Sequence, residues 1–366
     1  MYIYQRSGWP NFEWSIDSLL PLLSVVRHKQ GRLLGQMENL GFSLRSEAIL
    51  QTLTLDVLKS NEIEGDILDK EQVRSSIARR LGIETAGLVS SDRQVDGVVE
   101  VLLDATQNYE RQIASERLFG WHAAMFPGGH SGLHKITVGD WRSSHAGPMQ
   151  VISGPMGKET VHFEAPDASM VGKEMQNFIG WFNTIDDIDP VLKAAIAHFW
   201  FVTVHPFDDG NGRIARCIAD MQLARADGTA QRFYSMSVQI RKERAKYYTI
   251  LEKTQKGGLE ITDWLAWFLA CLDRALTTSE ESLSAVLRKA RFWEHIRQRE
   301  VNSRQQLMLN KLLDGFEGKL TTTKWAKITK SSQDTALRDI QQLIDQDILI
   351  KEASGGRSTN YVLREI

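Results

Sequence analysis

The sequence predicts a mainly α-helical protein with one β-hairpin near its middle and a distinct helix-and-strand region at its C-terminal end. Apolar residues recur at helical spacing through residues 15–80, and again through most of 96–271. The second stretch is interrupted at 130–166 by a segment rich in glycine, proline and β-branched residues, which favour turns and strands. After about residue 276, short helical patterns are followed by two strand-like runs.

The N-terminal region is expected to be helical. Its apolar residues fall on recurring helix faces: Leu19, Leu22, Leu23, Val26, Leu33, Leu34, Met37 and Leu40. Ahead of them, segment 9–14 alternates aromatic and polar residues around a proline. We expect this segment to pack the terminus onto the core, and we assign it no chemistry.

The middle of the chain contains a hairpin pattern and a buried-helix pattern. Segments 149–153 and 160–163 flank the turn signal GPMGK at 154–158, which predicts a β-hairpin with a wide turn. Residues 194–204 are apolar over the length of a buried helix. A second helix is expected to open within 205–216, because apolar residues recur beyond it at near-helical spacing: Ile214, Ile218, Met221 and Leu223.

The C-terminal region has the order helix, turn, helix, strand, strand. A connecting helix through Leu287, Phe292 and Ile296 leads to a short helix at 321–329 and a longer one at 331–344. The longer helix is expected to place four residues on one face: Ala336, Leu337, Ile340 and Leu343. Residues 348–363 indicate two strands around a Gly-Gly turn, and the whole resembles a winged helix-turn-helix. Because 13 basic residues face 10 acidic ones from 291 to 366, DNA and protein both stay open as partners.

Length and composition limit the broad class. The 366 residues fit two or three domains, and a net charge of −2 argues against a general polyanion binder. Cys217 and Cys271 are too few for a disulfide framework or a cysteine zinc site. The N-terminus lacks the form of a signal peptide, and no apolar run approaches a membrane span. We therefore expect a cytoplasmic protein that does not enter a membrane.

Segment 205–216, HPFDDGNGRIAR, contains the parts of a phosphate cradle. Gly210 and Gly212 let the backbone approach a ligand closely, and free N–H groups at a helix start favour an anion. Arg213 and Arg216 share one helix face and offer forked donors to phosphate oxygens. A phosphate-containing ligand is the expected guest.

The same segment offers a base and a metal ligand. A histidine such as His205 titrates near neutral pH and can accept a hydroxyl proton. The Asp209 carboxylate suits Mg²⁺, which prefers oxygen ligands. The Asn211 side-chain amide either binds phosphate or serves as a turn residue. His198 lies seven residues before His205, but without a third ligand the two do not predict a metal site.

Other catalytic motifs are absent from the sequence, including a P-loop, a His-Glu-x-x-His helix and a Gly-x-Ser-x-Gly elbow. HPFDDGNGRIAR instead resembles the Fic motif, His-x-Phe-x-(Asp/Glu)-Gly-Asn-Gly-Arg-x-x-Arg, at every fixed position. The N-terminal helical region and the C-terminal winged helix also resemble those of longer bacterial Fic proteins. The resemblance implies a Fic-type helical core with a β-hairpin flap, and transfer of AMP from ATP to a protein Ser, Thr or Tyr hydroxyl.

The resemblance also implies a role for each motif residue. His205 would be the general base toward the target hydroxyl, and Asp209 would bind Mg²⁺ or Mn²⁺. Asn211 and the backbone of Gly210 and Gly212 would hold the α- and β-phosphates. Arg213 and Arg216 would bind the β- and γ-phosphates. Phe207 would point into the core and anchor the loop.

Two further segments resemble parts of the family site. The hairpin at 149–163 resembles the flap that aligns a target segment by strand addition. Tyr247 and Tyr248 resemble the wall on the adenine side, and plain helix packing is the alternative for both.

Residues Ser60 to Gly65, SNEIEG, resemble the family's inhibitory pattern (Ser/Thr)-x-x-x-Glu-(Gly/Asn). Glu64 is expected to pair bidentately with Arg216, so that this arginine cannot orient the γ-phosphate. The alternative is an ordinary helix end, in which Gly65 caps one helix and Asp69 begins the next. Some relatives also remove AMP with the same glutamate, so addition and removal both stay open here.

The resulting division places an N-terminal helical region with the inhibitory motif at 1–92, a Fic catalytic core at 93–275, a connecting helix at 276–300 and a winged helix-turn-helix at 301–366. The leading hypothesis is an autoinhibited protein adenylyltransferase, with self-modification and dimer formation as further expectations. The alternative is a winged-helix DNA-binding regulator whose Fic-like core only senses nucleotide.

Overall fold

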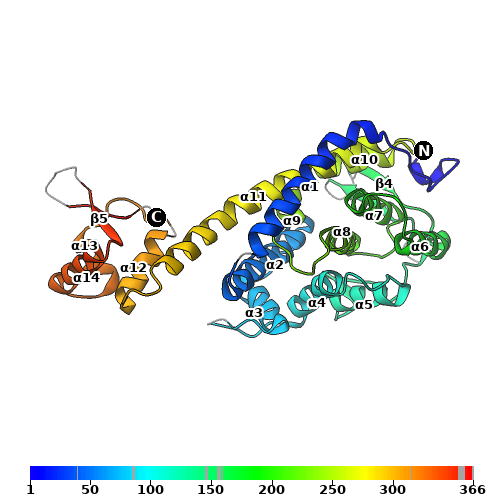
Figure 1. Cartoon of the computed structure of the whole chain (residues 1–366). Helices are drawn as coiled ribbons and strands as arrows, with labels where there is room; N and C mark the ends of the chain where they lie inside the picture. The colour runs from blue at the N-terminus through cyan, green and yellow to red at the C-terminus, as the bar shows by residue number, and fades with distance from the viewer. Residues whose placement is uncertain are drawn as a thin grey trace. The chain divides into compact units, whose positions relative to one another are not determined.

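A computed structural model confirms the mainly α fold (Figure 1). The structure describes residues 1–38, 40–84, 87–144, 147–154, 158, 160–313, 315–352 and 359–364. The helices of the first 260 residues are η1 (Ile3–Gln5), α1 (Ile16–Glu38), α2 (Phe42–Glu64), α3 (Lys70–Leu81), α4 (Arg93–Gln107), α5 (Ser115–Met125), α6 (Ala168–Asn183), α7 (Pro190–Val204), α8 (Asn211–Asp227), α9 (Met236–Lys242) and α10 (Arg244–Gln255). They are followed by α11 (Thr262–His295), α12 (Ser303–Leu313), α13 (Thr322–Thr329) and α14 (Gln333–Asp345).

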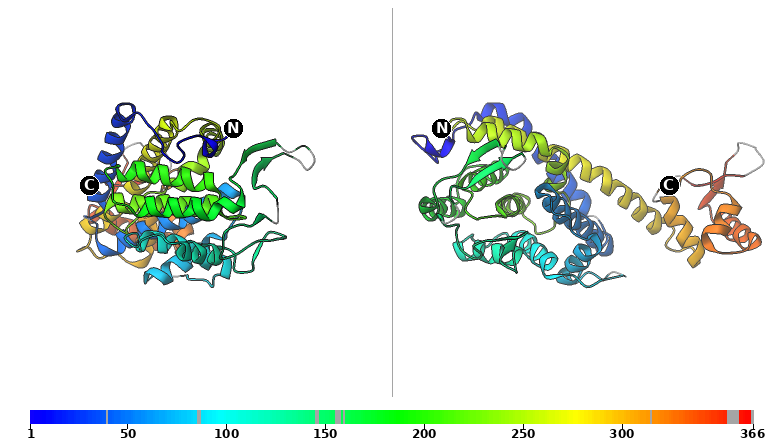
Figure 2. Two further views of the ribbon diagram at one scale, coloured as in Figure 1. Left: turned by 90° about the vertical axis from the view of Figure 1, so that its right-hand side faces the viewer. Right: turned by 180° about the vertical axis from the view of Figure 1, so that it is seen from behind.

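Within the described residues the strands form three antiparallel hairpins: β1 (His130–Ser131) with β2 (His134–Lys135), β3 (Gln150–Ser153) with β4 (Thr160–Glu164), and β5 (Leu349–Lys351) with β6 (Tyr361–Leu363). The β3–β4 hairpin is the predicted one, and it projects from the helical body (Figure 2). The short β1–β2 hairpin was not predicted. The predicted turn at 154–158 lies partly outside the described residues, as does the predicted Gly-Gly turn of the C-terminal hairpin.

The chain forms two compact units, Met1–Ser279 and Glu280–Ile366. The border lies inside α11, whereas the sequence suggested a separate connecting helix at 276–300, so the four-part division stays a prediction. No helix of the described residues combines the length and the apolar character that crossing a membrane requires.

In the first unit, α7 and α8 form the centre, and Figure 1 shows α8 almost end-on among α2, α4 and α7. Every residue of α7 after its first is buried, as expected for a helix that is apolar on all sides. Asp189 caps the helix by accepting from the Val191 N–H, and Pro190 occupies its first turn. The N-terminal aromatic segment packs on α7 as predicted, with Trp9 against Trp200 and Phe12 against Phe199.

Helix α2 is fixed to this centre by a buried polar network. Asp56 accepts a hydrogen bond from Ser235, which begins α9. Next to it, Arg232 pairs with Asp220 at 2.9 Å and with Asp227 at 3.2 Å. Burial raises the pKa of Asp56 and of Asp220, as expected where several carboxyl groups share one guanidinium in the core. The body of α2 is therefore an integral part of the fold.

The second unit has its own core, in which Trp325 of α13 packs with Ile340 and Leu343 of α14. The order of helices and strands is the predicted one, with β5 and β6 following α14. Leu337 was wrongly expected on the buried face and is 51% exposed. The reason is helical geometry, because the buried stripe follows Ala336, Ile340 and Leu343 at spacings of four and three.

Candidate functional site

The loop between α7 and α8 presents His205 as a neutral base. His205 ends α7 in the left-handed conformation, at φ 52°. Its Nδ1 lies 3.1 Å from the Val202 carbonyl oxygen, which can only accept, so Nδ1 carries the proton and Nε2 keeps a lone pair. Burial lowers the pKa of His205, so the ring is uncharged at neutral pH. Such a ring can accept a proton.

Two residues that the sequence did not reveal hold this loop in place. Arg142 is buried, and its Nε donates to the His205 carbonyl oxygen at 2.7 Å. His122 lies 3.2 Å from the Asp209 carbonyl oxygen through Nε2 and stacks on Phe207, with ring centroids 4.2 Å apart. Both act on backbone or on an apolar ring, and no local sequence pattern announces such contacts.

Asn211 clamps the loop through both ends of its amide. The Phe207 N–H donates to Oδ1 at 2.9 Å, and Nδ2 donates to the Phe207 carbonyl at 2.8 Å. Phe207 itself is fully buried, where the sequence placed it. The structure shows the turn role that the sequence left open for Asn211. Nδ2 uses one of its two protons in this clamp, so phosphate binding by the amide stays a prediction.

The two glycines leave room for different neighbouring side chains. Gly210 precedes α8 at φ 81°, and a Cβ there would press on the Phe126 ring. At Gly212 a Cβ would collide with the Glu64 carboxylate. Gly212 thus leaves the space that the end of α2 fills, in addition to any approach of a ligand.

The neighbours of Asp209 show which kind of cation its carboxylate can hold. Its carboxylate is 41% exposed, accepts from the Ser131 hydroxyl and lies 3.6 Å from Nη2 of Arg213. Among the described residues, no three His, Cys, Asp or Glu side chains gather as a metal site. A single accessible carboxylate fits Mg²⁺, which takes its other ligands from phosphates and water, and does not fit a metal held by protein alone.

Arg216 is held by the end of α2. Its Nη1 lies 2.8 Å from Oε1 of Glu64, so the predicted partner is the observed one. The predicted bidentate geometry is wrong, because Nε donates to the Ser60 hydroxyl at 2.9 Å and Nη2 to the Ser60 carbonyl at 2.8 Å. Ser60, one turn earlier, satisfies the side of the guanidinium that a bidentate carboxylate would need. Gly65 caps α2 at φ 97°, as the alternative of an ordinary helix end predicted. The ion pair and the helix cap are compatible with each other.

Arg213 is held by the same segment, which the sequence did not suggest. Its Nη1 lies 3.0 Å from Asp66 and 3.5 Å from Asn61 Oδ1. The guanidinium also lies over the Phe126 ring at 5.0 Å. Asp66 directly follows the predicted motif 60–65. Its negative charge beside Gly65 was the only feature of the sequence that could have indicated a partner for Arg213. Each motif arginine therefore has a carboxylate partner from the end of α2.

The two tyrosines of α10 have separate roles. Tyr247 is buried, and its hydroxyl lies 2.8 Å from His198 Nε2, which agrees with the packing alternative. Its place in the adenine-side wall stays a prediction. The Tyr248 hydroxyl lies 3.4 Å from Glu64 Oε2, and Arg244 lies over its ring. Tyr248 therefore lies beside the Glu64 carboxylate at the end of α2.

These groups surround one cleft of about 600 Å³, which we call the motif cleft. Its walls come from the end of α2, the motif loop, the β3–β4 hairpin and α10, including Glu64, His205, Gly212, Tyr247 and Tyr248. This volume is within the range of small-molecule and cofactor sites. The base, the glycine approach and the α2 carboxylate therefore share one space.

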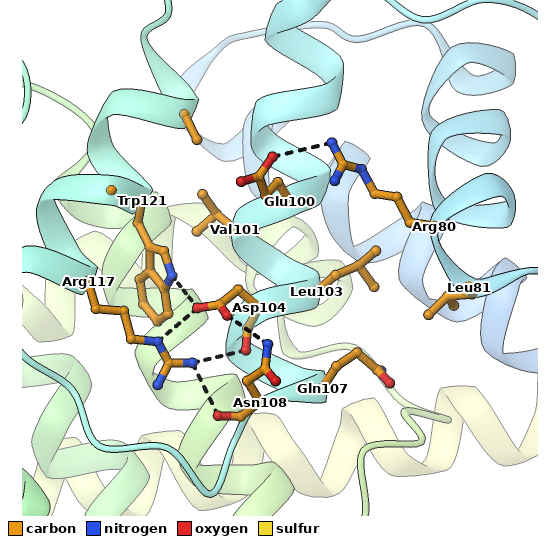
Figure 3. Close-up of a pocket in the computed structure, with 12 residues that line it drawn as sticks. Arg80, Leu81, Glu100, Val101, Leu103, Asp104, Gln107, Asn108, Arg117 and Trp121 are labelled. Atoms are coloured by element: carbon orange, nitrogen blue, oxygen red, sulfur yellow. Dashed lines mark hydrogen bonds and ion pairs between the residues drawn. The ribbon is translucent and has the colours of Figure 1, made fainter.

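A second hollow, of about 520 Å³, lies on α4 and α5 (Figure 3). Its central carboxylate, Asp104, accepts from Trp121 at 2.7 Å and from Arg117 and Asn108 at 2.8 Å. Because these partners engage Asp104 from several sides, we interpret the hollow as structural.

The exposed surface of the second unit is mixed in charge. Lys324, Lys327 and Lys330 are exposed along α13 and its end, whereas the exposed side of α14 places Asp334 close to Arg338. This mixture favours neither DNA nor protein as the partner.

Comparison with known proteins finds two family models. Residues 2–83 match a domain of unknown function (DUF4172), and residues 112–223 match the Fic/DOC family. The first match contains the end of α2, and the second contains the β3–β4 hairpin and the motif loop. The two matches therefore meet at the ion pair between Glu64 and Arg216.

The similar proteins include curated adenylyltransferases. "Protein adenylyltransferase Fic" of Drosophila melanogaster is 24% identical over 268 residues, covering 72% of this chain and 46% of the relative. "Protein adenylyltransferase fic-1" of Caenorhabditis elegans is 30% identical over 129 residues, covering 35% of this chain and 23% of the relative. The matches thus span less than half the length of these relatives.

Two solved structures share the fold. A Fic family protein from Desulfovibrio desulfuricans G20 aligns over 100% of this chain and 98% of its own, at TM-score 0.54 and 18% identity. A Fic domain containing signaling protein from Bacteroides thetaiotaomicron VPI-5482 aligns over 72% of this chain and 96% of its own, at TM-score 0.50 and 20% identity.

Proposed function

The chain belongs to the Fic domain family, and from that premise we propose that it is a protein adenylyltransferase, which transfers AMP from ATP to a hydroxyl of another protein. The observation that carries the proposal is the neutral His205, whose Nε2 lone pair is available in the motif cleft. On the adjoining first turns of α8, Arg213 and Arg216 have the carboxylates of Asp66 and Glu64 among their partners, and phosphate oxygens can replace carboxylates. Names of relatives at modest identity support the same reaction type.

In the proposed reaction, His205 Nε2 accepts the proton of the target hydroxyl as the hydroxyl oxygen bonds to the α-phosphorus. The bond from that phosphorus to pyrophosphate breaks, and pyrophosphate leaves. Asp209 would hold Mg²⁺ or Mn²⁺, which would neutralise phosphate charge. Arg213 and Arg216 would orient the outer phosphates, and the first-turn N–H groups of α8 at Gly212 would face the inner ones.

We further propose that the end of α2 inhibits the reaction. Arg216 is 2% exposed and already has Ser60 and Glu64 as partners, so a γ-phosphate must displace the Glu64 carboxylate to reach it. Glu64 is 28% exposed and can leave without unfolding α2. The same carboxylate could position water for removal of AMP, which is a second direction of the same site.

The target is proposed to add to the β3–β4 hairpin, in which the described residues pair two strands and no third one. Backbone pairing would align the target chain, whereas its Ser, Thr or Tyr identity would be set inside the motif cleft. The second unit would contact DNA or another protein. If the core only senses nucleotide, ATP will change DNA retention without any protein becoming labelled.

The test is transfer of labelled AMP from ATP to lysate proteins in the presence of Mg²⁺. We expect little transfer by the natural chain, strong transfer by Glu64→Gly, and none by Glu64→Gly with His205→Ala. Folding of each variant is checked by thermal unfolding. The absence of labelled lysate protein with a folded Glu64→Gly variant, at any metal concentration, rejects the proposed function.

A further inference from the structure

A serine, a histidine and a glutamate form a hydrogen-bonded chain on the wall of the motif cleft, apart from the motif itself. Ser153, the last residue of β3, lies 2.6 Å from Nε2 of His162 through its hydroxyl oxygen. His162 Nδ1 lies 2.8 Å from Oε2 of Glu252 on α10. All three residues line the motif cleft.

The direction of these hydrogen bonds follows from the charge of Glu252. Lys256 lies 2.6 Å from its other carboxylate oxygen, and this partner, followed by the His162 contact, keeps the Glu252 pKa below its ordinary value. An ionised carboxylate only accepts, so Nδ1 of His162 must carry the proton. In the neutral form of the ring Nε2 then holds the lone pair, and the Ser153 hydroxyl is the donor. This is the proton arrangement of an activated nucleophile.

A β-bulge aims His162 at this position. Val151 pairs with Phe163 and Ile152 pairs with Val161, so His162 is the extra residue of β4. A bulge re-aims a side chain and is common beside active sites. A regular ladder would give His162 a partner in register and would not turn its ring toward both Ser153 and α10.

We propose that Ser153 is a self-modification site that accepts AMP from a nucleoside triphosphate bound in the motif cleft, with His162 as its own general base and Glu252 orienting that base. The proposal rests on the proposed function, which supplies ATP to the cleft. The Ser153 oxygen bonds to the α-phosphorus, the bond to pyrophosphate breaks, and the hydroxyl proton moves to His162 Nε2. The product is a phosphodiester on the hairpin that also serves the target, so it would occupy the target's place.

The experiment uses the full-length Glu64→Gly variant with ATP and Mg²⁺, followed by intact mass and peptide mapping, while lysate labelling is measured in parallel. We expect an AMP-sized gain on Ser153 that Ser153→Ala removes from that peptide. Thr160→Val is the matched control, because Thr160 is the cross-strand partner of Ser153 and lies outside the cleft lining. With Thr160→Val, Ser153 should stay modified.

His162→Gln separates a base from a structural latch, since glutamine can hold a hydrogen bond but cannot take the proton. The ratio of Ser153 modification to lysate labelling should fall at least about 10-fold, as expected on loss of a general base. An equal fall in both signals, or AMP found on the chain only at other residues, overturns the proposal and leaves the proposed function standing. If neither the chain nor any lysate protein gains AMP, both are wrong.

Discussion

The front part of the twelve-residue motif, residues 205–211, and its rear part, residues 212–216, are held by different kinds of partner. In the front part, His205 and Asn211 bond to carbonyl and N–H groups of the local backbone. In the rear part, Arg213 and Arg216 bond to side chains and a carbonyl at the end of α2, about 150 residues earlier in the chain. The geometry of the front part therefore depends on local backbone, whereas the carboxylate partners of the rear part can be exchanged for phosphate oxygens.

Helix α2 shows the same contrast along its length. Its body is anchored by the buried Asp56, and Asn61 bonds back to Val57 at 2.8 Å. Its end carries Glu64 and Asp66, which are 28% and 46% exposed. The contact between α2 and the motif thus combines a fixed helix body with two partly exposed carboxylates, so the proposed inhibition would need only a local change for its release.

The largest effect is expected at the fixed base. His205→Asn removes the proton acceptor but tolerates the left-handed backbone at φ 52°, which asparagine adopts readily. In the Glu64→Gly background, transfer to lysate proteins should fall about 10²- to 10⁴-fold, the usual contribution of a general base. Urea unfolding is the control and should change by less than about 1 kcal/mol. Retained transfer would assign the base elsewhere.

Loss of the Asn211 side-chain amide should lower the stability of the fold. Asn211→Ala leaves the buried N–H and carbonyl of Phe207 without partners, at about 1–3 kcal/mol for each buried group. We expect the free energy of unfolding to drop by about 2–6 kcal/mol in urea titrations. A stable Asn211→Ala variant that only binds ATP more weakly would show that the amide serves phosphate binding and not the loop.

The exchangeable partners of the two arginines are tested first at Glu64. Glu64→Gln keeps the size of the side chain and removes the charge that holds Arg216. Hydrogen bonds to charged groups contribute about 1.5–3 kcal/mol, which corresponds to a gain in transfer of about 10- to 100-fold. Glu62→Gln is the matched control, because Glu62 lies on the same helix end but pairs with Lys59 at 2.6 Å. If AMP transfer increases equally in both variants, the ion pair of Glu64 with Arg216 is not the inhibitory contact.

The sequence could predict the parts of the site that are local. Contiguous residues supplied the base, the glycines and both arginines, and helical spacing supplied α7 and α8. Among the tertiary contacts of the site, the pair of Glu64 with Arg216 was predicted through the resemblance to the inhibitory pattern, whereas other contacts could not be predicted. Arg142 and Asp66 reach the motif from other elements, and the bidentate geometry at Arg216 failed because Ser60 takes two of its donors. Likewise, no periodicity announces that the bulge in β4 turns His162 toward Ser153.

A smaller effect is expected at the second carboxylate. Asp66→Asn weakens the hold on Arg213 but leaves Asn61 and the Phe126 ring in contact with it. Because Asp66 is nearly half exposed, its pair should contribute about 1 kcal/mol or less, so transfer should rise about 2- to 5-fold. The increase should multiply with that of Glu64→Gln if the two carboxylates act on separate arginines. If AMP transfer does not increase in either background, the inhibitory contact is limited to Arg216.

The smallest effect is the pH dependence of the released enzyme. The neutral ring of His205 is the active form, and its pKa is lowered by burial, so lowering the pH toward 6.5 should leave most of the base unprotonated. Glu64 raises this pKa by its charge, so its removal lowers the pKa further. For Glu64→Gln, kcat/KM for ATP, which reports the free enzyme, should change less than about 2-fold between pH 8 and 6.5 and fall below that range. A fall that begins above pH 7 would mean a protonated ring, and hence that Nδ1 and Val202 do not fix a neutral base.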